Sequence, residues 1–200
     1  MKTAYISLAI IVVIVLIVYI ARSASKNSPD AKGAQGDTVK TQTHTTEMNK
    51  FQDLRSMAFS ITAEELGIVM PLDKTVVYGV IMDWEIGDGI VTLVSYKTGD
   101  ASLYLNSGGG IIGGGQHANV NAAARQYVEK AQSFLANADK TTTTTNLPAK
   151  NELYFYLLTN DGVFLGKEEI NNIENNSSPW IDLFTEGNIV ITELRNISSE

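Results

Sequence analysis

The sequence predicts an α+β protein with an N-terminal transmembrane helix, a flexible tether and one domain in which helices pack on a mostly antiparallel five-stranded sheet. Three observations predict it. Residues 4–21 form an uninterrupted apolar run, residues 23–46 are polar, and residues 47–200 alternate between helix-like and strand-like hydrophobic patterns. We therefore divide the chain into an anchor (1–22), a disordered tether (23–46) and a soluble domain (47–200).

The predicted anchor reads AYISLAIIVVIVLIVYIA and contains no charged residue, proline or glycine. As a helix it extends about 27 Å, close to the ~30 Å hydrocarbon core of a bilayer. Ile and Val are poor helix formers in water, but in lipid a helix satisfies every backbone polar group. The run therefore predicts a signal-anchor of a single-pass membrane protein, in contact with the lipid bilayer through residues 4–21.

Two alternatives for this run remain open. A cleaved signal peptide has an apolar stretch of about 7–15 residues, whereas this run is longer and Ser23-Ala24-Ser25 is a poor cleavage site. A helix that is apolar on every face is also found in the core of large domains. Basic residues are more numerous after the run than before it, which favours a cytoplasmic location for the soluble domain, with an extracytoplasmic one still open.

Composition narrows the classes of partner and cofactor. The formal net charge is −7, and acidic residues outnumber basic ones from Glu47 onward. Such a domain is repelled by phosphate backbones, so we expect no nucleic-acid partner. Cysteine is absent and histidine occurs only at His44 and His117, so the sequence predicts neither a disulfide nor a metal site. No cofactor is predicted.

The first half of the domain predicts one helix and three strands. Apolar residues spaced by three and four predict a helix over 47–66, ended by Gly67. Alternating apolar residues then predict strands over 75–86, 90–97 and 101–106. The turns between these strands contain glycine and are short, so the three strands form an antiparallel meander.

The second half predicts a helix, a hairpin and further helices. The longest helical stripe covers 117–138 and is followed by a loop rich in threonine. Strands over 152–159 and 163–166 flank an Asn-Asp-Gly turn. A short helix over 168–174 precedes a last helix that begins at Ser178-Pro179, with a strand over 188–195 as the alternative after Gly187.

One loop of the domain predicts a ligand site. Ser107 to Gly115 reads SGGGIIGGG and lies between a predicted strand and a predicted helix. Such glycines let a backbone approach a phosphate closely, and the amides at a helix N-terminus favour anions. The predicted ligand-binding residues are Gly108, Gly110, Gly113, Gln116 and His117. The alternatives are a flexible loop, a loop packed tightly against a neighbour, and a partner-docking tip formed by the two isoleucines of the loop.

Three carboxylates, Asp83, Glu85 and Asp88, gather at the first predicted hairpin. Carboxylate pairs serve acid–base chemistry or Ca²⁺ binding, but the spacing here is not that of a calcium-binding loop. We interpret them as the charged, exposed face of the sheet and its turn. No nucleophile or kinase motif is present, so no catalytic residue is predicted.

Three functions follow from these features. The favoured one is a membrane-anchored, non-catalytic binding or scaffold domain with a protein partner. The alternative is a sensor or enzyme that binds a nucleotide or phosphometabolite at Gly108–Gly115. The third is a domain secreted after signal cleavage.

Overall fold

The computed structural model describes residues 36–87 and 89–198. In chain order its elements are α2 (Gly36–Ser60), β1 (Val77–Ile86), β2 (Gly89–Tyr96), β3 (Ala101–Leu105), β4 (Gly110–Ile111), the 3-10 helix η1 (Gly114–Gln116), α3 (Ala118–Ala131), the 3-10 helix η2 (Gln132–Asn137), β5 (Asp139–Thr141), β6 (Glu152–Thr159), β7 (Gly162–Glu169), α4 (Ile170–Glu174) and α5 (Ile181–Ile197).

The strands form one seven-stranded antiparallel sheet in the order β4-β3-β2-β1-β6-β7-β5. Strand β1 is central, and its Met82 lies opposite Leu93 of β2 and Phe155 of β6. The predicted meander of three strands and the later hairpin are both confirmed. Strands β4 and β5 are very short and lie at the two edges.

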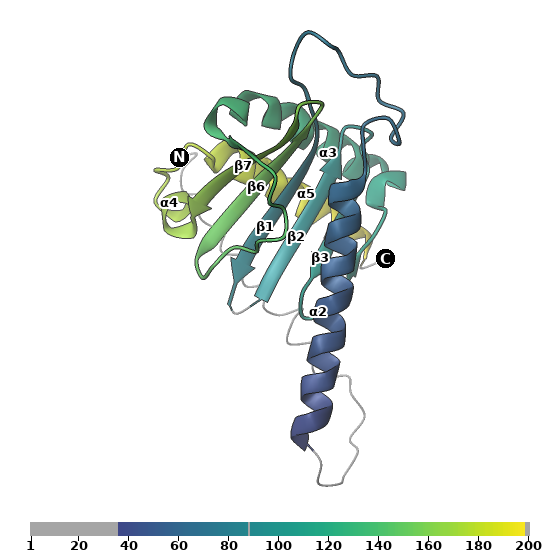
Figure 1. Ribbon diagram of the computed structural model, residues 1–200, viewed down its shortest axis with the longest axis vertical. Helices are drawn as coiled ribbons and strands as arrows, with labels where there is room; N and C mark the ends of the chain where they lie inside the picture. Colours follow the sequence, from purple (N-terminus) through teal and green to yellow (C-terminus); the bar gives the residue numbers. More distant parts are fainter. Residues whose placement is uncertain (1–35, 88, 199–200) are drawn as a thin grey trace.

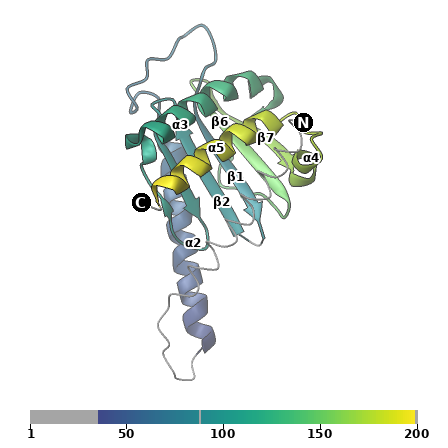
Figure 2. The same cartoon turned by 180° about the vertical axis from the view of Figure 1, so that it is seen from behind.

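Helices cover both faces of the sheet. Helices α3 and α5 pack together across one face, as seen from behind in Figure 2. Helix α2 lies on the opposite face, where the loop between β5 and β6 also runs (Figure 1). Each face therefore carries its own hydrophobic core, with the sheet between them.

The side chains of β1 divide between these two cores. Val80, Met82 and Trp84 point to the α3–α5 side, as their period-two spacing requires. Tyr78 belongs instead to the core under α2, because a register shift lies between Val77 and Gly79. Ile81 also packs under α2. A strand buried on both faces is apolar almost throughout, and alternation alone does not reveal this.

The predicted five-stranded sheet is wrong, because the sheet has seven strands. The two additional strands are β4, within the glycine loop, and β5, at the start of the threonine-rich segment. Each pairs with its neighbour over only two or three residues. Segments this short show no hydrophobic period in the sequence. They become strands only because they pair with a neighbouring strand.

The limits of the first helix also differ from the prediction. Helix α2 begins at Gly36, inside the segment predicted to be a disordered tether, and ends at Ser60. Extending a formed helix costs less than starting one, so a polar segment can continue a helix that is anchored further along. The predicted continuation to residue 66 is instead a turn, in which Thr62 and Glu65 bond reciprocally. Residues 23–35 lie outside the described residues.

The membrane prediction is corrected as well. Within residues 36–87 and 89–198, no helix is both long enough and apolar enough to cross a bilayer. Helix α2 has the length, but charged residues occur along it. The apolar run 4–21 lies outside the described residues. The predicted transmembrane helix and single-pass localisation are therefore not retained, whereas the contact of residues 4–21 with lipid is not tested and stays a prediction.

Candidate functional site

The glycine loop is built into the edge of the sheet. Gly110 pairs with Tyr104 of β3, so close that a Cβ would overlap the neighbouring backbone. The amide of Gly113 donates to the Ser102 hydroxyl at 3.1 Å, and the amide of Gly115 donates to Asp100 Oδ1 at 3.1 Å. These amides are thus occupied by the protein itself, and the Asp100 carboxylate opposes the approach of a phosphate.

Two of the five predicted ligand-binding residues, Gly108 and Gly110, share a groove in the described part of the chain. This groove of about 250 Å³ lies against α2. The groove contains one basic residue, Lys50, whose ammonium group pairs with Glu47 at 3.0 Å. Gly113 lies outside this groove, and Gln116 and His117 are exposed at the junction of η1 and α3. The predicted docking isoleucines also separate, since Ile112 is 67% exposed whereas Ile111 packs against the core.

Asp83 does not lie on an exposed face, because it is completely buried. It forms a two-oxygen ion pair with Arg55 of α2, whose side chain is 5% exposed. The Thr92 hydroxyl donates a further hydrogen bond to the same carboxylate. Burial raises the pKa of the Asp83 carboxyl, and the Arg55 and Thr92 contacts oppose that rise.

Arg55 also fastens a loop across this face. Its guanidinium donates to the carbonyl oxygens of Thr144 and Asn146, and it lies 4.8 Å from the ring centroid of Phe59. The Tyr156 hydroxyl donates to the same Asn146 oxygen at 3.0 Å. With its charge paired and its hydrogen bonds used, this buried cluster joins structural elements and leaves little for a ligand.

A loop of residues 67–74, which we call the projecting loop, extends past the end of the sheet (Figure 1). Ile68 and Met70 turn inward and pack against the core under α2. Val69 and Leu72 point outward and are 95% and 105% exposed. Large apolar side chains exposed this fully contribute almost nothing to folding.

The projecting loop is held at both ends. At its start, the amides of Gly67 and Ile68 each donate at 2.8 Å to the turn that follows α2. At its end, the side-chain amide of Asn160 donates to the carbonyl oxygens of Pro71 and Lys74, at 2.8 and 3.0 Å. The loop thus presents its apolar side chains in a defined position.

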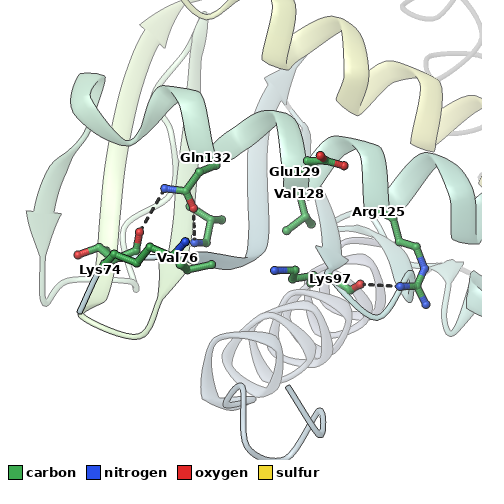
Figure 3. A pocket seen from close by; sticks show the side chains of 9 residues that line it. Lys74, Val76, Lys97, Arg125, Val128, Glu129 and Gln132 are labelled. Atoms are coloured by element: carbon green, nitrogen blue, oxygen red, sulfur yellow. Dashed lines mark hydrogen bonds between the residues drawn. The ribbon is translucent and has the colours of Figure 1, made fainter. Parts of the chain in front are cut away.

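Beside the projecting loop lies a hollow of about 550 Å³, which we call the cationic hollow. Residues 74–77 form one wall, Lys97 from the β2–β3 turn lies beneath, and α3 contributes Arg125 and Glu129 (Figure 3). Gln132, the first residue of η2, ties this wall to the end of α3, because its side-chain amide accepts from Val77 N at 2.9 Å and donates to the Thr75 carbonyl oxygen. The basic side chains of Lys74, Lys97 and Arg125 thus concentrate positive charge in this hollow, although the chain as a whole is acidic.

The sequence did not predict the cationic hollow or the projecting loop. The basic residues of the hollow come from three separate segments and match no motif. For the loop, a signal was present, because Val69 and Leu72 stand in a segment that Gly67 and Pro71 exclude from a helix.

Comparisons of the chain with protein-family models, with curated proteins and with solved structures found no match. Within residues 36–87 and 89–198, no group of three or more His, Asp or Glu side chains is placed to hold a metal ion.

Proposed function

We propose that this protein is a non-catalytic binding domain that docks a protein partner through the projecting loop. The observation that supports the proposal is the pair Val69 and Leu72, both almost fully exposed on a loop that is fixed at its ends. A partner with an apolar recess gains about 1.5–3 kcal/mol for each such side chain that it buries completely.

The fixed loop reduces the cost of this docking. Immobilising a mobile side chain or loop at an interface consumes binding free energy, and a loop that is already held avoids much of that loss. The three hydrogen bonds of the Asn160 side chain hold the loop before any partner arrives. Removing either apolar side chain should then weaken binding roughly tenfold or more.

The test compares immobilised full-length protein with its Val69→Ser and Leu72→Ser variants, using an extract of the source cells. Met57→Ser is the matched control, because Met57 is also apolar and 63% exposed but lies on α2. We expect at least one protein to be captured by the unaltered chain and by the control, and to be lost with both loop variants. The affinity of that protein is then measured with all four chains.

Because both loop side chains are exposed, the loop variants should keep the free energy of unfolding within about 0.5 kcal/mol of the original. Sedimentation of the purified chain shows whether the partner is a second copy, whose dimer Leu72→Ser would then dissociate. The proposal fails if neither capture nor self-association depends on Val69 and Leu72, or if Met57→Ser abolishes the same interaction.

A further inference from the structure

The cationic hollow brings together charges that the described part of the protein leaves without partners. Lys74 and Lys97 form no side-chain hydrogen bond or ion pair with any residue of 36–87 and 89–198. By contrast, Lys130 and Lys140 are each paired with an aspartate. Unpaired cations that share one concave surface raise the local positive potential and attract anions.

Arg125 is the third cation of the hollow and is held in place. Its Nε donates to Asn121 Oδ1 at 2.7 Å, and its Nη1 donates to the carbonyl oxygen of Lys97 at 3.2 Å (Figure 3). A guanidinium has five N–H donors, so donors remain after these two bonds. Because Arg125 donates to the backbone of Lys97, the position of its guanidinium is fixed relative to the β2–β3 turn.

The inner surface of the hollow is apolar. Val77 and Val128 are buried beneath it, and Val76 is half-buried beside them. A site with an apolar floor and a few charged groups at its margin is typical of small-molecule sites, and the volume of about 550 Å³ lies in their usual range. Glu129 is the one acidic side chain in the lining, so the lining has a net positive charge.

We propose that the cationic hollow binds a small molecule that carries two negative charges, as a phosphate or a pair of carboxylates, on an apolar body. Lys97 and Arg125 contact the anionic group, with Lys74 at the margin. The apolar body lies over Val77 and Val128. This site is separate from the contact surface of Val69 and Leu72, so it stands or falls independently of the protein-docking proposal.

The probes are phenyl phosphate and phenylsuccinate, which share a ring and differ in the anionic group. Inorganic phosphate and phenol supply the anion alone and the ring alone. Binding to the full-length chain is followed by amide chemical shifts at constant ionic strength. We expect saturable shifts around Lys97 and Arg125 with at least one ring-bearing dianion, weaker binding of inorganic phosphate and none of phenol.

Variants then distinguish binding at a specific site from unspecific attraction of an anion to a basic surface. Lys97→Gln and Arg125→Gln should each weaken binding at least fivefold. Lys150→Gln, an equal charge change at an exposed residue outside the hollow, should leave it unchanged. Glu129→Gln should tighten binding, because it removes a repulsive charge from the lining.

The proposal is overturned if neither dianion gives saturable shifts below about 5 mM, or if the shifts occur elsewhere on the chain. It is also overturned if Lys150→Gln weakens binding as much as Lys97→Gln does, since attraction is then unspecific. Unfolding curves of each variant are recorded alongside. These residues are exposed, so lost binding with unchanged stability separates a site from a folding defect.

Discussion

Replacing Arg55 by methionine tests whether the buried ion pair fastens α2 to the sheet. The substitution removes the partner of a completely buried carboxylate, that of Asp83, while keeping a long apolar side chain. It also leaves the carbonyl oxygens of Thr144 and Asn146 without their guanidinium donors. We therefore expect a large loss of stability with little change in volume.

The magnitude follows from the burial of both partners. Breaking a buried ion pair by removing one partner costs about 3–5 kcal/mol, which is a large part of the 5–15 kcal/mol that stabilises a typical domain. The double variant Arg55→Met with Asp83→Leu should recover part of this loss, because it leaves no buried charge uncompensated. The assay is urea unfolding, with the free energy extrapolated to water.

The pair of Lys140 and Asp161 provides the contrast within the same chain. It has a similar distance, 2.8 Å, but its side chains are 55% and 57% exposed. Lys140→Met should cost less than about 1 kcal/mol, because water screens an exposed pair. If Arg55→Met costs no more than Lys140→Met, or if the double variant is less stable than Arg55→Met alone, the reasoning is refuted.

Three further predictions concern the packing and the pH dependence of stability. Gly166→Ala places a methyl group against the ring of Trp180 and should lower the free energy of unfolding by about 1–3 kcal/mol, measured in urea. Gly110→Ala should lower the melting temperature, because it brings a Cβ against the next strand at a positive φ. Glu152 accepts bonds from a backbone amide and the Tyr154 hydroxyl, which lower the pKa of its carboxyl. Its contribution to stability is therefore present above pH 4.5 and lost as the pH falls through the lowered pKa, and Glu152→Gln should flatten the acid limb of the stability curve.

The elements with a local signal could be predicted from the sequence. The three-stranded meander follows from period-two spacing and from glycine at its turns, where Gly87 and Gly99 both have positive φ. The long helical stripe likewise predicts α3, although its last turns tighten into η2. In each case, residues close together in the chain determine the structure.

What the sequence did not predict depends on residues that are distant in the chain. Asp83 follows the pattern of an exposed strand position, and Arg55, 28 residues earlier, supplies the opposite charge that makes its burial possible. The cationic hollow likewise needs Lys97 and Arg125 to meet beside the start of β1. At the glycine loop, the structure shows close packing of Gly110 against the backbone of β3 and of Gly114 against the side chains of Leu194 and Val120, while the predicted ligand binding there stays a prediction.

The two separate cores have a consequence for how the protein opens. The sheet, α3 and α5 come from one continuous stretch, residues 77–197, and enclose one complete core without any help from α2. Helix α2 and the loop that contains Thr144 cover the other face and share the guanidinium of Arg55. Slow amide exchange should therefore show two cooperative units, with this cover opening as a whole while the β1–α5 layer stays closed. A partner that pulls α2 away from the sheet would therefore expose the core beneath α2 and leave the core beneath α3 and α5 intact.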